Sequence, residues 1–262
     1  MVGLQGKVAL ITGAGSGIGQ ATAELLADEG VRIGALELDA AEARRVAGHI
    51  GAHGGEAVAL IADISQARQV EACVRELHGR YGRLDIVFAN AGVNGVWAPL
   101  EQLGPEDFDR TLRINLHGTF HTIKYSVPYL KQGGGGSVII TSSVNGTRIF
   151  SNSGATAYSC SKAAQVTLAK MLALELAPDK IRVNVICPGA VRTNIKQSTE
   201  ARDLEEARIP VEYPAGKLPL TGGEPGEPEQ VAKLVRFLAS EESSLVTGTE
   251  IWIDAAESLL VG

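Results

Sequence analysis

The chain has 262 residues, of which 45% are hydrophobic and 21% charged, and its formal net charge is −6. A chain of this length and composition can bury a substantial core, as one large domain or two small ones. The acidic balance and the lack of a lysine or arginine run argue against nucleic acid or an anionic membrane as a partner and favour a small molecule.

The lack of a recognisable targeting signal and the cysteine pattern both bear on the cellular compartment. No apolar segment approaches the roughly 20 residues that cross a bilayer, and residues 1–7 lack the layout of a signal peptide. Cys73, Cys160 and Cys187 are an odd number without Cys-x-x-Cys spacing, which argues against disulfides or a zinc knuckle. We therefore predict a cytoplasmic protein with reduced thiols and no membrane segment.

The first predicted elements are a strand, a glycine-rich turn and a helix. Residues 7–12 form a short apolar run without amphipathic period, as in a parallel strand buried on both faces. Residues 20–29 have a helical pattern that Gly30 ends. The glycines between them let the backbone approach a pyrophosphate, and the helix N-terminus favours an anion. We predict a dinucleotide site in this turn, with candidate residues Gly13, Ser16, Gly17, Ile18 and Gly19.

The next predicted strand, residues 31–36, is followed by an acidic residue. Glu37 stands 18 residues beyond Gly19, and a carboxylate at about this distance can accept hydrogen bonds from both ribose hydroxyls of an adenosine. It would also repel a 2′-phosphate. The alternative is a solvated acid in a loop, but because the glycine-rich turn precedes it we favour the ribose interpretation and NAD as the cofactor.

The rest of the chain continues to alternate between predicted strands and predicted helices. Strands are predicted at residues 57–62, 84–88, 137–141, 181–186 and 250–254, and helices at residues 40–50, 69–80, 105–130, 157–176 and 230–239. The strands lead into polar or glycine turns, and ligands bind at that edge of an open parallel sheet. We predict one α/β domain over residues 1–262, a Rossmann-like doubly wound parallel sheet of about seven strands with helices on both faces. Residues 190–228, rich in proline around a helical patch at 200–207, are interpreted as a lid.

Tyr158 and Lys162 lie four residues apart in a predicted helix and so share one face. A neighbouring ammonium lowers the pKa of a phenol toward the range of a general acid/base. Such a pair alone is more often an ordinary surface contact. A second pair at this spacing, Tyr213 and Lys217, has a proline and a glycine inside it, which oppose a helix.

Two polar features of the helix predicted at residues 105–130 have structural explanations. Asn115 lies in an apolar stretch, where an amide usually satisfies backbone groups or shapes a local bend. His117 and His121 share a face, but Gly118 stands where a zinc protease motif has glutamate. We therefore interpret the histidines as solvated or facing a subunit, and predict no metal site.

The motifs occur in one order, namely Thr12-Gly13-x-x-x-Gly17-x-Gly19, Asp63, Asn90-Ala91-Gly92, Asn115, Ser143, Tyr158-x-x-x-Lys162 and Pro188-Gly189-x-x-x-Thr193. In these motifs the chain resembles the short-chain dehydrogenase/reductase family over essentially its whole length. The resemblance implies an NAD-dependent oxidoreductase that interconverts a secondary alcohol and a ketone. Tyr158 would be the catalytic acid/base, with Lys162 lowering its pKa and holding the nicotinamide ribose. Ser143 would orient the substrate oxygen, and Asn115 would hold a water in a proton relay.

The resemblance also implies cofactor contacts and an assembly. Asp63 and the Ile64 backbone would contact adenine, and Thr193 would bond the nicotinamide carboxamide. The other implied cofactor-binding residues are Asn90, Ala91, Gly92, Pro188, Gly189 and Val191. The helices of Asn115 and Tyr158 would form subunit interfaces of a homotetramer. The chain departs from the family pattern at Ala89, in a slightly longer loop between Ser143 and Tyr158, and at Ala255-Ala256, where glycines are usual.

The sequence leaves two alternative functions. An epimerase or dehydratase of the same fold tends to have a longer chain with a substrate domain, and a non-enzymatic nucleotide sensor or scaffold would not need an intact Tyr/Lys/Ser/Asn set. The substrate pocket is expected at residues 93–98, 145–150 and 194–226. Apolar side chains there suggest an apolar secondary alcohol, of cyclic, steroid-like or sugar-derived type: Val96, Trp97, Ile149 and Phe150.

Overall fold

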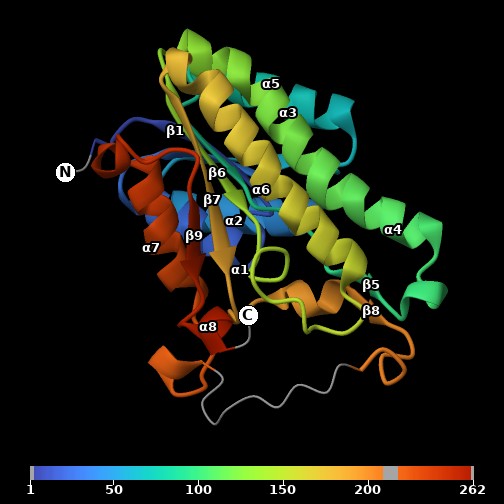
Figure 1. The fold of residues 1–262 in the computed structure, drawn as a ribbon. Coiled ribbons are helices and arrows are strands. Elements are labelled where there is room, and N and C mark those ends of the chain that lie inside the picture. The colour runs from blue at the N-terminus through green and yellow to red at the C-terminus, as the bar shows by residue number, and fades with distance from the viewer. Residues whose placement is uncertain (1–2, 209–217, 261–262) are drawn as a thin grey trace.

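A computed structural model describes residues 3–208 and 218–260 of the chain (Figure 1). Its main sheet has seven parallel strands in the order β3-β2-β1-β4-β6-β7-β9, which confirms the predicted fold class. The strands are β1 Val8–Thr12, β2 Arg32–Glu37, β3 Ala57–Ile61, β4 Ile86–Ala89, β6 Gly136–Thr141, β7 Ile181–Pro188 and β9 Glu250–Ile253. The Tyr213 and Lys217 pair lies outside the described residues.

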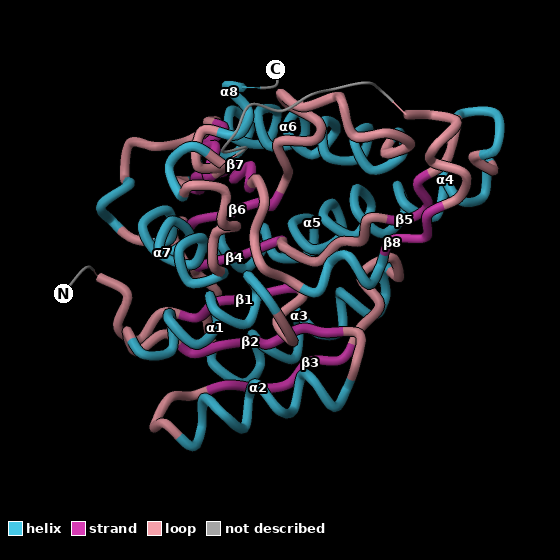
Figure 2. Tube along the Cα trace, turned by 90° about the horizontal axis from the view of Figure 1, so that it is seen from below, coloured by secondary structure: helices cyan, strands magenta, loops and turns pink. Residues whose placement is uncertain are grey.

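Helices cover both faces of this sheet (Figure 2). One face packs against α1, α2 and α7, and the other against α3, α5 and α6. The helices are α1 Gly17–Asp28, α2 Ala40–Ala52, α3 Ala67–Tyr81, α4 Pro105–Leu112, α5 Gly118–Gln132, α6 Thr156–Leu176, α7 Pro228–Ala239 and α8 Glu257–Leu260. None of the helices in the described part of the chain is long and apolar enough to cross a membrane.

The central strand β1 shows why an apolar run without period becomes a buried parallel strand. All five of its residues are buried. Leu10 belongs to the core on one face of the sheet and Ile11 to the core on the other, since successive side chains of a strand point to opposite faces. Burying one such side chain contributes about 1.5–3 kcal/mol. The strand therefore fixes the position of the glycine-rich turn that follows it.

The helix predicted at residues 105–130 is interrupted. The structure has α4, then a π-helical turn at Arg113–His117, then α5. The buried Asn115 lies in the π-helical turn, and its side chain is bonded to the Val93 backbone. The expectation that the Asn115 amide satisfies backbone groups therefore agrees with the structure.

The helical patch predicted at residues 200–207 is wrong. Thr199–Ala201 forms strand β8, which pairs in parallel with β5, Gly95–Trp97. The Arg202 N–H donates to the Trp97 carbonyl at 2.9 Å, and its guanidinium binds Asp107 at 2.7 Å. These partners are about a hundred residues away, so long-range pairing overrides the local helical pattern. Short 3₁₀ turns occur at Leu100–Gln102, Ala177–Asp179, Asn194–Ser198, Pro219–Thr221 and Glu241–Ser243.

Candidate active site

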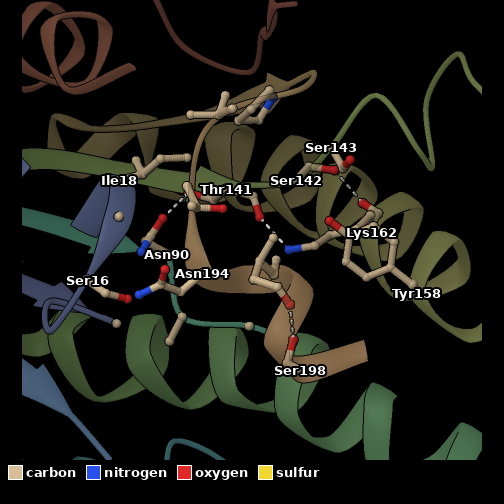
Figure 3. A pocket seen from close by; sticks show the side chains of 18 of the residues that line it. Ser16, Ile18, Asn90, Thr141, Ser142, Ser143, Tyr158, Lys162, Asn194 and Ser198 are labelled. Carbon is tan, nitrogen blue, oxygen red and sulfur yellow. Dashed lines mark hydrogen bonds between the residues drawn. The ribbon is translucent and has the colours of Figure 1, made fainter. Parts of the chain in front are cut away.

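A cleft lies at the carboxyl ends of the central strands and gathers most of the predicted site residues (Figure 3). It is bordered by the glycine-rich turn, the ends of β2, β4, β6 and β7, and the first turns of α6. The lining residues are Gly13, Ser16, Gly17, Ile18, Glu37, Asn90, Ala91, Gly92, Thr141, Ser142, Ser143, Tyr158, Lys162, Pro188, Gly189, Val191, Thr193, Asn194, Ile195 and Ser198.

The glycine-rich turn leaves backbone surface open toward this cleft. Gly13 and Gly17 have φ of +66° and +52°, which favour glycine. A Cβ on Gly19 would lie 2.0 Å from the Gly13 carbonyl oxygen, so only glycine allows α1 to start this close to β1. Ser16 caps α1 without a side-chain cap hydrogen bond. The free N–H groups at this helix start suit an anion such as a pyrophosphate.

Glu37 faces the same turn from the end of β2. Its Oε2 accepts a hydrogen bond from the Gly15 N–H at 3.0 Å, and its Oε1 accepts from the Leu38 N–H at 2.8 Å. Each carboxylate oxygen can accept a second hydrogen bond. The carboxylate is therefore held in the cleft with acceptor capacity left for two hydroxyl groups.

Asn90, which lines the cleft, connects the ends of three strands by hydrogen bonds. Its Nδ2 donates to the Thr12 carbonyl at 3.2 Å, and its Oδ1 accepts from the Thr141 hydroxyl at 3.1 Å. The Thr12 hydroxyl in turn accepts from the Asn90 and Ala91 N–H groups at 3.0 and 3.1 Å. The ends of β1, β4 and β6 are thus fixed relative to one another.

The three side chains nominated for catalysis meet on the other side of the cleft. Tyr158 and Lys162 both come from the first turns of α6, and the Lys162 Nζ lies 5.6 Å from the centre of the Tyr158 ring. The Ser143 hydroxyl accepts from the Asn145 N–H at 3.1 Å and is hydrogen-bonded to Tyr158. Ser142 also lines the cleft, but its hydroxyl donates to the Lys162 carbonyl at 2.8 Å and so anchors α6.

Burial controls the ionisation of this group. It raises the pKa of the Tyr158 phenol, and the hydrogen bond with Ser143 opposes the rise. Burial also lowers the pKa of the Lys162 ammonium to about 8. That ammonium donates to the Thr141 carbonyl at 2.9 Å, as Figure 3 shows. The expected lowering of the tyrosine pKa by Lys162 thus differs from the structure, where burial outweighs the other effects.

Four of the nominated residues lie outside the cleft. Asn115 is fully buried, with its Oδ1 accepting from the Val93 N–H at 2.8 Å and its Nδ2 donating to Val93 and Ser161. Gly19 is buried inside the first turn of α1. Asp63 accepts from the Ser65 N–H at 2.9 Å, and the buried Ile64 carbonyl contacts the His121 ring at 3.1 Å.

Several cleft residues were missed by the sequence reasoning. Thr141 ends β6, where its strand position was a usable signal. The others, Asn194, Ile195 and Ser198, belong to the 3₁₀ turn Asn194–Ser198. The sequence indicated this turn only as part of a long segment. A segment without periodicity gives no indication of which side chains turn inward.

Comparisons with known proteins agree with this geometry. A family model described as enoyl-(acyl carrier protein) reductase matches residues 13–255. The cyclohexanol dehydrogenase of Acinetobacter sp. (strain SE19) is 36% identical over 250 residues, which are 95% of this chain and 94% of that protein.

Two solved structures are similar over almost the whole chain. A 3-ketoacyl-ACP reductase from Sinorhizobium meliloti 1021 is 53% identical, with a TM-score of 0.93 and coverage of 97% of this chain and 99% of that chain. A 3-ketoacyl-(acyl-carrier-protein) reductase from Brucella melitensis complexed with NADH is 32% identical, with a TM-score of 0.84 and the same two coverages of 97% and 99%.

Proposed function

The chain belongs to the short-chain dehydrogenase/reductase family of oxidoreductases, and on that basis we propose that it transfers hydride between NAD(H) and a secondary alcohol or ketone. The observation that carries this proposal is the placement of Tyr158, Ser143 and Lys162 in the same cleft as the glycine-rich turn and Glu37. A proton-transfer group and a dinucleotide site in one cleft are what hydride transfer requires.

The cleft residues fit a nicotinamide dinucleotide. The turn at residues 13–19 would hold its pyrophosphate, and Glu37 its adenosine ribose. The cleft wall at residues 188–193, which includes Thr193, would hold the nicotinamide half. When bound, this group supplies the carbon that takes or gives hydride. The Brucella melitensis relative was solved with NADH, which supports a nicotinamide cofactor for this chain.

Proton transfer would depend on Tyr158. As an alcohol is oxidised, its hydroxyl proton has to leave, and the Tyr158 phenolate would accept it. The Ser143 hydroxyl accepts from the Asn145 N–H and is hydrogen-bonded to Tyr158. A substrate oxygen placed between Ser143 and Tyr158 would take over that hydrogen bond, and the Ser143 proton would then stabilise the developing carbonyl oxygen. Because burial favours the neutral phenol, the Lys162 ammonium would be needed to stabilise the phenolate.

For the substrate we propose a small apolar secondary alcohol, of cyclic type, bound beside Tyr158. The Trp97 and Tyr158 ring centres are 6.4 Å apart, and Val96 and Ile149 are buried nearby in the chain segments expected to form the pocket. The cyclohexanol dehydrogenase relative supports this class. The segment predicted as a lid, residues 190–228, includes the Asn194–Ser198 turn that borders the cleft, and we propose that it closes over the substrate.

A second candidate substrate is a 3-oxoacyl group on a carrier protein, as in the two solved relatives. Recognition of an acidic carrier would need free basic side chains near the cleft. Arg192 is instead paired with Glu224 and Glu227 at 2.5 and 2.8 Å, and Arg202 with Asp107 and Glu200 at 2.7 and 2.6 Å. These ion pairs leave fewer free basic side chains for a carrier, although Lys196 in the Asn194–Ser198 turn is exposed and outside the ion pairs found among the described residues. The free alcohol is therefore the first candidate and the carrier-bound group the second.

The experiment that tests the proposal is a panel of secondary alcohols and ketones, followed at 340 nm with NAD or NADH. We expect turnover with cyclic apolar members, and at most weak turnover with an oxoacyl carrier protein. The absence of hydride transfer to or from every member, with NADH bound, would favour a nucleotide sensor or scaffold instead.

Lys162→Met is expected to lower both turnover and NADH affinity, because one ammonium would serve the tyrosine and the nicotinamide ribose. The folded protein should lose no stability at neutral pH. Lys162 is still charged there, and burial destabilises this charged ammonium relative to the unfolded chain, as the lowering of its pKa to about 8 indicates. Calorimetry with NADH and thermal unfolding measure the two effects. Unchanged NADH affinity would contradict the dual role, and a large drop in Tm would indicate misfolding.

We also propose a homotetramer built on α5 and α6, which lie side by side (Figure 1). Large apolar side chains are exposed on these helices, with Phe120 44%, Met171 68% and Leu174 82% exposed. Light scattering should give four times the mass of one chain. Met171→Lys combined with Leu174→Lys should break this assembly, whereas Leu100→Lys, at another exposed apolar residue, should leave it intact. A parent protein that is monomeric at micromolar concentration would refute the proposal.

A further inference from the structure

The turn after β9 holds two residues in an unusual backbone conformation. Ala255 and Ala256 have φ of +52° and +66°, in the left-handed region that residues other than glycine rarely adopt. The Asp254 carboxylate supports this turn by accepting from the Ala256 N–H at 3.3 Å and the Ser258 N–H at 3.0 Å. Backbone in such a conformation persists only where the surroundings determine it strongly.

This turn directs Glu257, the first residue of α8, toward the cleft wall. Glu257 is only 6% exposed, and its Oε2 accepts from the Ala190 N–H at 3.1 Å. A Cβ on Gly189 would lie 2.8 Å from the same Oε2, so the carboxylate packs directly on the Gly189 backbone. Gly189 lines the cleft.

The turn after β9 and the cleft wall are both hydrogen-bonded to the segment at residues 220–226. The Leu220 N–H donates to the Ala255 carbonyl at 3.2 Å. The Gly226 N–H donates to the Ala190 carbonyl at 3.0 Å, and the Arg192 N–H donates to the Gly226 carbonyl at 2.9 Å. Ala190 is therefore held by its N–H to Glu257 and by its carbonyl to Gly226, which fixes the peptide that follows Gly189.

We propose that Glu257 is a positioning residue for the cofactor cleft, because from the C-terminal turn it fixes the wall at residues 188–193. The inference rests on the proposed function in one respect, that the ligand of this wall is NAD(H). Removing the carboxylate leaves the Ala190 N–H without this acceptor and opens space behind Gly189. The wall residues Val191 and Thr193 then lose their fixed position, although Glu257 itself does not border the cleft in the structure.

The first test measures the wall without any nucleotide. Amide hydrogen exchange of the segment at residues 186–196 is followed by mass spectrometry in the parent, Glu257→Ala, Glu257→Gln and Leu259→Ala. Leu259 lies in the same four-residue helix but is 73% exposed, so its variant is the matched control. We expect exchange in this segment to be at least tenfold faster in Glu257→Ala. Glu257→Gln keeps an acceptor oxygen, and it and the control should stay within about threefold of the parent.

The second test measures NADH affinity by the fluorescence of the bound nicotinamide. Glu257→Ala should raise Kd by roughly 10- to 100-fold, and Glu257→Gln should restore most of the affinity. If Glu257→Ala does not fold, Glu257→Asp takes its place, since it keeps the charge but shortens the reach to Ala190. Unchanged exchange and a Kd within twofold of the parent in a folded Glu257→Ala or Glu257→Asp would overturn the inference. If the parent binds no NADH, the proposed function fails, while the exchange data still decide whether Glu257 holds the wall.

Discussion

Tyr158→Phe is expected to lower kcat by roughly 10²- to 10⁴-fold while NADH affinity stays within about threefold of the parent. The substitution removes the phenolic oxygen that would exchange a proton with the substrate, and it removes almost no volume. The ring remains packed in the buried first turn of α6, where its centre lies 6.4 Å from that of Trp97. The loss should therefore fall on the chemical step and not on binding.

The measurement combines steady-state turnover at 340 nm with nicotinamide fluorescence for NADH binding. Tyr81→Phe is a matched control, because Tyr81 is the last residue of α3, is not among the residues that line the cleft, and loses the same single oxygen. The control should retain parental turnover. A Tyr158→Phe protein that works within tenfold of the parent rate would remove Tyr158 from the catalytic role.

The pH dependence follows from the two buried groups. Alcohol oxidation needs the Tyr158 phenolate, which becomes more populated as pH rises. Because burial raises the pKa of Tyr158, the increase in the rate of oxidation should occur above neutral pH. Lys162 loses its proton near pH 8, because burial lowers its pKa to about that value. Loss of the ammonium removes the stabilisation of the phenolate, so the increase should level off or reverse at higher pH. Ketone reduction, which needs the neutral phenol, should favour lower pH.

Local patterns were enough to predict the parts of the site that depend on neighbouring residues. The turn at residues 13–19 follows from glycines between a buried strand and a helix, and the Tyr158 and Lys162 pair follows from helical spacing. The parallel sheet followed from apolar runs separated by helical patterns, because such strands are buried on both faces. For the turn and the Tyr158 and Lys162 pair, the determining interactions lie within a few residues of one another, whereas for the sheet only the strand segments and their parallel direction follow from local patterns.

Contacts between distant segments could not be predicted in this way. The pairing of β5 with β8 brings Trp97 next to Ala201, and nothing in the composition of either segment indicates it. The bonds of Asn115 to Val93 depend on where the two chain segments pack. Glu257 is similar, since its link to Ala190 spans 67 residues and the sequence showed only that alanines had replaced glycines before it.

The coenzyme provides the second large effect, and NAD is expected to be preferred over NADP by roughly 10- to 1000-fold in kcat/KM. The Glu37 carboxylate is held in the cleft by the Gly15 and Leu38 N–H groups, where it would face the adenosine ribose. Two like charges about 4 Å apart repel by about 1 kcal/mol in water and by several kcal/mol in a partly desolvated cleft. That range corresponds to the stated preference.

The nearest cation on α2 does not offset this repulsion. The Arg45 guanidinium is paired with Glu42 at 2.7 Å and donates to the Gly15 carbonyl at 2.7 Å and to Gln20 at 2.9 Å. These bonds hold the guanidinium at the Gly15 carbonyl and at α1, and Arg45 is not among the residues that line the cleft. A 2′-phosphate would therefore meet the Glu37 carboxylate without a free cation from Arg45.

Glu37→Ser combined with Leu38→Arg should shift the preference toward NADP, because the pair of changes removes the repulsion and adds a phosphate partner at a side chain that is 68% exposed. Leu38→Arg alone is the matched control. It adds the cation but keeps the carboxylate, so NAD should remain preferred. The measurement is kcat/KM with each coenzyme on the parent and both variants. Equal values or an NADP preference in the parent would show that Glu37 does not face the ribose, since a carboxylate at that position could not tolerate the added phosphate charge.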